Sequence, residues 1–222
     1  MNGGTSNLLI VPARTSGDTD DERGITLFAV AADSGGLACN AYATIDGLRA
    51  AEVTLDEVRV SHDTVLGETD NGFPDLDATI DEATLAICAE AVGIMQVLKD
   101  KTVEYSKDRS QFGVPIVSFQ ELQHRMVDML MACEQAQSLL MWAVMASESG
   151  SADNKRAVSS IKYLVSSAGR ALGEDAIQIH GGMGVTWELD VAHYFKRLTA
   201  IGTLLGDADW HLDKLASSSQ QA

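Results

Sequence analysis

The fold is decided by the stretch LAICAEAVGIMQVLK, residues 85–99. Its apolar and small residues recur at spacings of three and four, which places a largely apolar stripe along one face of a helix. We expect this helix to begin at about Asp77. The same spacing recurs over residues 122–144 and predicts a second helix that stops near Gly150.

Two further helices follow along the chain. The third is expected from about Ala152 to Ile179, and the fourth from just after Thr186 to about Ala216. Four long helices with short connections form an antiparallel, up-and-down bundle. The sequence therefore predicts a carboxy-terminal four-helix bundle domain over residues 76–217.

Three sequence features mark the ends of these helices. Ser118 is expected to cap the second helix, with Glu121 three residues later completing a capping box. The hydroxyl of Thr186 is expected to cap the fourth helix. The third helix is expected to end at the pair Gly181 and Gly182, because glycine commonly follows a helix.

The amino-terminal part has a different period. Short β-type runs lie at Leu8–Val11, Ile25–Val30 and Ala51–Val60, with glycine-containing turns around them. So few strands cannot cover a sheet alone, so we expect residues 1–70 to be an incomplete middle β-domain that lacks an amino-terminal portion. The predicted fold class is α+β and mostly α, a partial β-domain followed by the bundle.

Composition narrows the possible partners. The 16 Lys and Arg residues face 32 Asp and Glu residues, which gives a net charge of −16. Such a chain repels nucleic acid backbones and anionic membrane surfaces, so we expect no nucleic acid and no membrane partner. Its longest apolar runs are far shorter than the ~20 residues of a membrane span. A soluble, cytoplasmic protein is therefore expected.

The three cysteines, Cys39, Cys88 and Cys133, are far apart in the sequence. Their odd number and wide spacing favour neither a disulfide framework nor a zinc site. We expect buried, reduced thiols and no bound metal.

The segment Arg109–Gly113 joins the first two helices and carries a guanidinium, an amide and an aromatic ring. The guanidinium of Arg109 has the chemistry to pair with a phosphate, and the ring of Phe112 to lie against a planar base. A capping arginine beside a core phenylalanine is the structural alternative.

The segment Asp175–Gly184 closes the third helix and has three glycines in four residues. Such a segment lets a ligand or another chain approach the backbone closely. It follows a helix, so it is not the dinucleotide-binding fingerprint, and a simple helix end is the alternative. His180 has no second histidine or cysteine at metal-ligand spacing, and we expect a hydrogen-bonded loop residue.

Taken in order, these segments resemble the acyl-CoA dehydrogenases over nearly the whole chain. The resemblance rests on Arg109–Gly113, Phe119-Gln120, Gln178–Gly184, Tyr194–Arg197, and Leu55–Val60 with Gly67 closing it. The segments Gly184–Leu189 and Gly206–His211 are most similar to small subunits of dicarboxylyl- or steroid-type members, which commonly work as hetero-oligomers.

The resemblance implies FAD as cofactor, bound across a subunit boundary so that this bundle receives the adenosine diphosphate part of a neighbour's flavin. Arg109 would pair with the pyrophosphate, and glycines would allow close approach. The implied cofactor-binding residues are Arg109, Gln111, Phe112, Phe119, Gln120, Gln178, Gly181 and Gly182.

The implied reaction removes an α-proton from an acyl-CoA thioester while a β-hydride passes to FAD, giving a trans-2-enoyl-CoA. The family's usual glutamate precedes a Gly-Thr pair, but here Ile201 precedes Gly202-Thr203. Other members place the base early in the first helix, at the position of Ala83; Glu82 is one residue away. One residue turns a side chain by about 100° around a helix, so a solvated Glu82 is the alternative. The catalytic residue stays unassigned.

Two functions remain open from the sequence. One is an acyl-CoA dehydrogenase subunit that contributes a FAD half-site, acts on an acyl-CoA and passes electrons to an electron-transfer acceptor protein. The other is a catalytically silent partner that completes the FAD site of a longer chain. A plain helical interaction domain would leave the ordered motifs unexplained.

Association into homo- or hetero-oligomers with another acyl-CoA dehydrogenase chain is also expected. Apolar residues on the second helix cover more than one face and exceed what one bundle interior needs. They are Leu139, Leu140, Met141, Trp142 and Val144.

Overall fold

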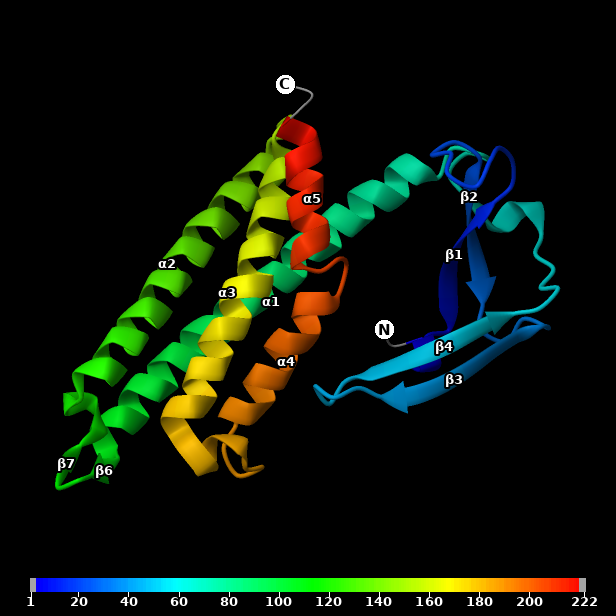
Figure 1. The fold of residues 1–222 in the computed structure, drawn as a ribbon. Coiled ribbons are helices and arrows are strands. Elements are labelled where there is room, and N and C mark those ends of the chain that lie inside the picture. Colours follow the sequence, from blue (N-terminus) through cyan, green and yellow to red (C-terminus); the bar gives the residue numbers. More distant parts are fainter. Residues whose placement is uncertain (1–2, 220–222) are drawn as a thin grey trace. The chain divides into compact units, whose positions relative to one another are not determined.

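A computed structural model describes residues 3–219 and forms two compact units, residues 1–80 and 81–222 (Figure 1). The first unit contains the strands β1 to β5, and the second contains the helical bundle. The predicted fold class is confirmed, because a small partial sheet precedes a set of long helices.

The first unit is built on two small antiparallel sheets. In one, β2 (Ile25–Ala31) lies between β1 (Leu8–Arg14) and β5 (Val65–Leu66). The other is a ribbon of β3 (Leu37–Ala43) and β4 (Arg49–Leu55). Single turns of 3-10 helix lie at Gly3–Thr5 (η1) and His62–Thr64 (η2). Burial in the sheet is concentrated on β2, where Thr26, Leu27 and Val30 are buried.

The structure of this unit differs from the sequence predictions in three respects. The run Ala51–Val60 is a strand only as far as Leu55, because the chain turns there and Glu57 has a φ of 49°. The strand β3 was not expected, since its side chains are almost all exposed and give no apolar alternation. Cys39 lies on β3 and is exposed, so the expectation of a buried thiol is wrong for it.

Among the residues that the structure describes, the second unit contains five helices, a short hairpin and two 3-10 turns. The helices are α1 (Phe73–Asp108, whose start belongs to the first unit), α2 (Gln120–Glu148), α3 (Asn154–His180), α4 (Val191–Thr203) and α5 (Ala208–Ser219). The hairpin joins β6 (Ser110–Gln111) to β7 (Val114–Pro115), and the turns are η3 (Ile116–Ser118) and η4 (Gly181–Val185).

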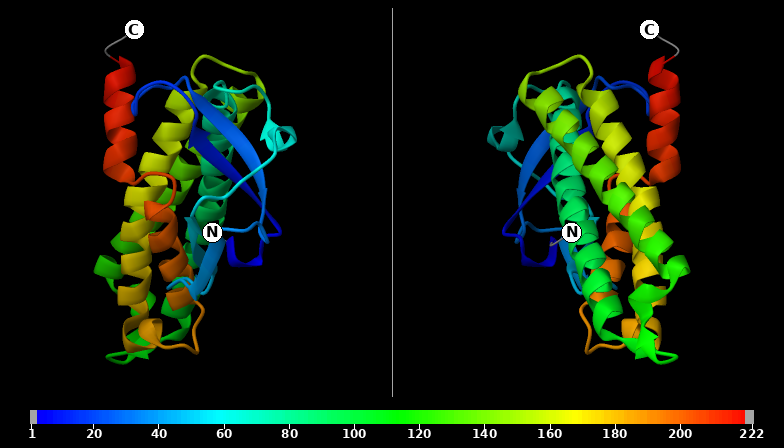
Figure 2. Two further views of the ribbon diagram at one scale, coloured as in Figure 1. Left: turned by 90° about the vertical axis from the view of Figure 1, so that its right-hand side faces the viewer. Right: turned by 90° about the vertical axis from the view of Figure 1, so that its left-hand side faces the viewer.

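Helix α3 is the central helix, in contact with α2, α4 and α5 (Figure 2). The core is formed by side chains from all the long helices, with Met95, Met129 and Ile161 almost fully buried. Cys88 and Cys133 belong to this core as free thiols, as expected. Burial raises the pKa of Cys88 to about 12 and that of Cys133 to about 11, so both stay protonated at neutral pH.

The expected fourth helix is in fact two helices, because the backbone leaves the helical conformation between α4 and α5. Leu205 and Gly206 have φ values of 56° and 98°. A Cβ on Gly206 would lie 2.5 Å from the ring of Trp210, so only glycine fits there. Asp207 then accepts a hydrogen bond from the backbone N–H of Trp210 (2.9 Å) and starts α5.

Both side-chain caps expected from the sequence are wrong. The hydroxyl of Ser118 donates to the carbonyl of Pro115 (2.7 Å), and Phe119 stands at the N-cap of α2. The hydroxyl of Thr186 donates to the carbonyl of Met183 (2.9 Å), and α4 begins only after Asp190. In each case the hydroxyl donates to a carbonyl within a tight turn before the helix and therefore does not cap the helix.

Candidate functional site

The implied cofactor-binding residues all lie at one end of the bundle. The end of α1, the β6–β7 hairpin, the start of α2, the end of α3 and η4 meet there (Figures 1 and 2). All eight side chains or glycines are exposed. The site therefore has two walls, a hairpin wall from Arg109 to Gln120 and a glycine wall from Gln178 to Gly182.

The hairpin wall is organised by a two-residue turn. Phe112 and Gly113 have φ values of 54° and 84°, as a tight hairpin that follows the twist of its strands requires. Positive φ is unusual for a bulky residue such as phenylalanine. The ring of Phe112 is 93% exposed and stands edge-on to the ring of Phe119, with 6.1 Å between centroids. The alternative of a core phenylalanine is wrong.

Arg109 stands where α1 gives way to the hairpin. Its backbone N–H donates to the carbonyl of Tyr105, and its carbonyl accepts from the N–H of Ile116, both at 2.8 Å. The guanidinium is exposed and makes no ion pair with any residue that the structure describes. By contrast, Arg125 on α2 is paired with Glu121 and Asp175.

The glycine wall offers open space beside the backbone. Gly181 has a φ of 61°, and a Cβ built on Gly181 or Gly182 would meet no atom within 4 Å. Gly184 differs, because its Cβ would lie 2.8 Å from the carbonyl oxygen of Ile177. Gly184 is therefore needed for packing, whereas Gly182 leaves room for something outside the chain. Gln178 is exposed in the last turn of α3.

The two walls are joined by residues that the sequence analysis did not single out. The ring of Tyr105 stacks on that of His180, with centroids 4.3 Å apart and planes at 25°, and its hydroxyl donates to the His180 carbonyl (3.3 Å). Arg125 and Asp175 add an ion pair between α2 and α3 (3.2 Å). Tyr105 lies one helical turn before Arg109, and this spacing is the sequence feature that could have indicated Tyr105 as a residue of the site.

His180 is the last residue of α3, buried rather than on a loop as expected. Its Nδ1 lies 2.8 Å from the carbonyl oxygen of Ala176, so Nδ1 carries the proton and donates. Burial lowers the pKa of the imidazole, which is therefore neutral at pH 7. A neutral ring stacks on Tyr105 without bringing an unpaired charge into the bundle.

The corner between α4 and α5 contains a second polar cluster that the sequence analysis missed. The ammonium of Lys162 on α3 is fully buried and donates to the carbonyls of Gly206 (2.6 Å) and Gly202 (3.4 Å). His211 Nε2 donates to the carbonyl of Leu205 (3.0 Å). The residue before Gly202-Thr203 is Ile201, which is buried (1% exposed) and provides no carboxylate at this position.

Glu82 does not belong to this cluster. Its side chain is exposed on α1 and makes no ion pair with the described residues. The carboxylate on the inner side is that of Asp81, which is buried and lies 3.9 Å from the ammonium of Lys214.

Among the described residues there is no group of three His, Cys, Asp or Glu side chains arranged to hold a metal. None of the helices between residues 3 and 219 has the length and apolar character needed to cross a bilayer.

Comparison with known proteins identifies the family. The family model described as "Acyl-CoA dehydrogenase, C-terminal domain" matches residues 70–219. Acyl-CoA dehydrogenase IpdE2 of Mycolicibacterium smegmatis is 38% identical over 162 residues, covering 73% of this chain and 50% of that protein. The mitochondrial short-chain specific acyl-CoA dehydrogenase of Mus musculus is 32% identical over 184 residues, covering 81% and 44%. The chain therefore belongs to the acyl-CoA dehydrogenase family and spans about half the length of these relatives.

Solved structures agree in fold. Butyryl-CoA dehydrogenase from Megasphaera elsdenii superposes with a TM-score of 0.90 at 27% identity, over 99% of this chain and 57% of that one. The glutaryl-CoA complex of glutaryl-coenzyme A dehydrogenase gives 0.92 at 25% identity, over 99% and 56%. PigA with FAD and proline shares the fold, with a TM-score of 0.93 at 24% identity over 99% and 57%.

Proposed function

We propose that this chain is a subunit of an acyl-CoA dehydrogenase and that its bundle end binds the adenosine diphosphate part of a FAD molecule held by a neighbouring chain. The assembled enzyme would convert an acyl-CoA thioester to the trans-2-enoyl-CoA and pass two electrons to an electron-transfer acceptor protein. Bound FAD would supply the acceptor for the hydride that leaves the β-carbon.

The observation that carries the proposal is that the site contains both an arginine side chain without an ion-pair partner among the described residues and an exposed aromatic ring. Arg109 has no carboxylate partner in the described chain, although the chain has twice as many acidic as basic residues. Phe112 is exposed at the tip of a hairpin whose backbone is unusual for its residue type. A pyrophosphate beside a planar base would satisfy both side chains.

The glycine wall suits the same ligand. The space beside Gly181 and Gly182 is open, so a phosphate could approach the backbone more closely than a side chain at either position would allow. Gln178, Gln111 and Gln120 supply exposed amides around it. The join between Tyr105 and His180 would hold the two walls at a fixed separation. The residues present therefore fit the group.

A catalytically silent partner subunit is the second candidate, and the corner between α4 and α5 favours it. Ile201 offers no proton acceptor, and the nearby carbonyls of Gly202 and Gly206 are held by the ammonium of Lys162. A silent partner would complete the FAD site and scaffold the assembly, while a longer chain supplied the base. The two candidate functions differ in whether Glu82 acts as the proton acceptor.

Steady-state turnover tests both candidates. The chain would be assayed with FAD, an acyl-CoA and an artificial electron acceptor, alone and after assembly with a longer acyl-CoA dehydrogenase chain. We expect flavin binding and turnover only in the assembly. Loss of turnover in Glu82→Gln would assign the proton acceptor to this chain, whereas unchanged turnover would favour the silent partner. Robust turnover by the chain alone would contradict the half-site.

A further inference from the structure

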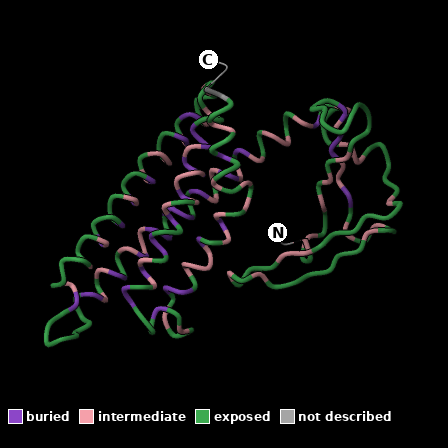
Figure 3. The backbone as a smooth tube through the Cα atoms, viewed as in Figure 1, coloured by how far each residue is buried: buried purple, intermediate pink, exposed green. Residues whose placement is uncertain are grey.

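Helix α5 is held to the bundle mainly by polar contacts. Of its residues 208–217, for which burial is described, only His211 is buried. Trp210 and Leu212 are 49% and 44% exposed. In Figure 3, α5 lies just before the C label and consists mainly of exposed and intermediate residues. A helix that buries so little apolar surface gains little hydrophobic stabilisation, so its attachment depends on polar groups.

The corner between α4 and α5 is fixed by two hydrogen-bond donors. The ammonium of Lys162 on α3 donates to the Gly206 carbonyl (2.6 Å), and His211 Nε2 on α5 donates to the Leu205 carbonyl (3.0 Å). Leu205 has a φ of 56°, a conformation that costs free energy in a bulky residue and persists only where neighbouring contacts impose it. The position of α5 therefore depends on both hydrogen bonds.

The buried ring of His211 has no partner for a second proton. Because a carbonyl only accepts, Nε2 carries the ring proton and Nδ1 has the lone pair. Nδ1 is buried and has no hydrogen-bond partner among the described residues. A proton on Nδ1 would therefore create a buried cation with an unpaired N–H, which is unfavourable.

Two ammonium groups also oppose a positive charge on this ring. The pKa of His211 is lowered chiefly by burial, and Lys162 and Lys214 lower it further. The hydrogen bond to the Leu205 carbonyl and the carboxylate of Asp207 act in the opposite direction. The balance lowers the pKa, so the ring is neutral at pH 7.

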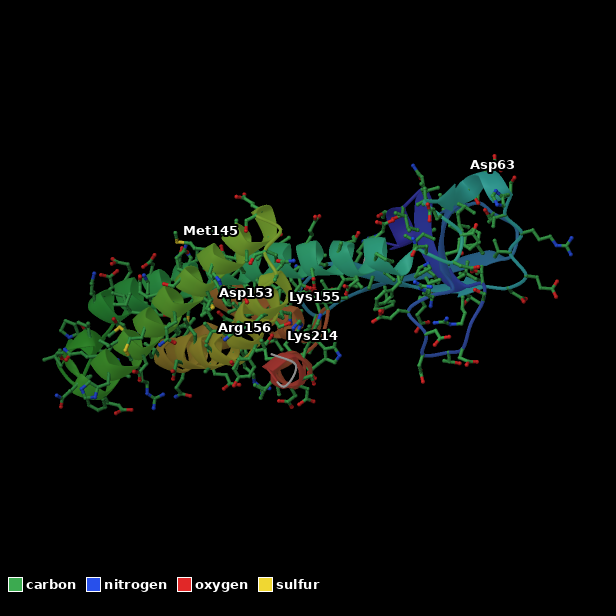
Figure 4. The ribbon with its side chains drawn as sticks, turned by 90° about the horizontal axis from the view of Figure 1, so that it is seen from above. Asp63, Met145, Asp153, Lys155, Arg156 and Lys214 are labelled. Atoms are coloured by element: carbon green, nitrogen blue, oxygen red, sulfur yellow. The ribbon has the colours of Figure 1, made fainter. Side chains whose placement is uncertain are left out.

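Helix α1 contributes two titratable groups to the surroundings of α5. Lys214, labelled in Figure 4, extends from α5 and lies 3.9 Å from the buried carboxylate of Asp81. Cys88 interacts electrostatically with Lys162, and burial keeps its thiol protonated and uncharged. The ion pair between Lys214 and Asp81 is thus a third polar contact that holds α5 to the bundle.

We propose that protonation of His211 releases α5 from the bundle. A neutral ring keeps the corner closed. An imidazolium leaves the buried position for water, where histidine has its ordinary pKa of about 6.5, and α5 moves with it. Leu205 and Gly206, with φ values of 56° and 98°, form the hinge. Release also separates Lys214 from Asp81 and gives that carboxylate access to water.

The release of α5 is independent of the proposed FAD half-site, so its test uses the full chain without FAD. Hydrogen–deuterium exchange, corrected for the pH dependence of the chemical exchange rate, would be followed in α5 and α2 between about pH 7.5 and 5. Protection of α5 should fall by up to about ten-fold per pH unit below about pH 6.5, because each release takes up one proton. Protection of α2 should fall less, because apolar packing holds that helix.

Two variants isolate the role of His211. His211→Gln keeps an N–H that can donate to the Leu205 carbonyl but takes up no proton, so α5 should stay protected below about pH 6.5. His180→Gln is the matched control. His180 is also buried, with a pKa lowered by burial, but it is the last residue of α3 and lies away from Lys162. In this variant α5 should respond to pH as in wild type.

A wild-type titration keeps the proposal testable if His211→Gln does not fold. The nuclear magnetic resonance signal of the His211 ring and the protection of α5 should then change with the same midpoint. Different midpoints would overturn the proposal, and so would constant protection of α5 between about pH 7 and 5. An unchanged pH dependence in His211→Gln, a lost response in His180→Gln, or an equal loss of protection in α2 and α5 would also overturn it.

Discussion

Replacing Tyr105 by leucine would test whether one aromatic contact holds the two walls of the site together. The change removes the stack on His180, which contributes about 0.5–1.5 kcal/mol. It also removes the hydrogen bond to the His180 carbonyl, which contributes about 0.5–1.5 kcal/mol. We expect the free energy of unfolding of the bundle to fall by about 1–3 kcal/mol. Tyr105→Phe keeps the stack and should cost less than half as much.

Urea unfolding followed by far-UV circular dichroism measures this loss, because the signal comes mainly from the helices. Tyr163→Leu is the matched control: Tyr163 is half-buried on α3, and its ring stacks on no described residue. A Tyr105→Leu variant as stable as wild type, or one destabilised only as much as Tyr163→Leu, would refute the role of this contact.

Two further predictions concern pH and glycine. Burial lowers the folded-state pKa of both His180 and His211. The free energy of unfolding should therefore decrease as pH falls below about 6.5, by up to about 1.4 kcal/mol per pH unit for each histidine. Urea titrations at several pH values check this, and a free energy of unfolding that does not change between about pH 7 and 5 would contradict it. Gly184→Ala should lower the melting temperature because its Cβ meets the carbonyl of Ile177, whereas Gly182→Ala should leave the melting temperature unchanged and weaken FAD binding by the assembly; equal effects on stability would refute the distinction.

The helices were predictable from the sequence because each buries one face, and burial imposes a spacing of three and four. The spacing does not show where a helix ends, and the break between α4 and α5 was missed for this reason. Its signal was the pair Gly206-Asp207, a residue suited to positive φ followed by a residue suited to capping. The ribbon of β3 and β4 gave a weaker signal, because a strand exposed on both faces has no apolar alternation.

The site could be outlined only through ordered motifs, and the roles of its residues stay predictions. Short motifs such as Arg109–Gly113 carry local chemistry and can be read along the chain. The contact between Tyr105 and His180 joins residues 75 positions apart, and only tertiary packing brings them together. The buried ammonium of Lys162 is similar, since the carbonyls of Gly202 and Gly206 that accept from it lie 40 and 44 residues away.

The most direct test of the central claim is hydrogen–deuterium exchange of this chain, assembled with a longer acyl-CoA dehydrogenase chain, with and without saturating FAD. If the bundle end is a FAD half-site, exchange should slow in residues 109–120 and 178–184, while the opposite end of α3 is unaffected. Arg109→Ala should weaken that protection, with an apparent affinity lower by about ten-fold to a hundred-fold, because a charge-assisted hydrogen bond is lost. Arg156→Ala, which removes an exposed arginine at the start of α3, should leave it unchanged. Protection elsewhere, or protection equal in Arg109→Ala and wild type, would contradict the account.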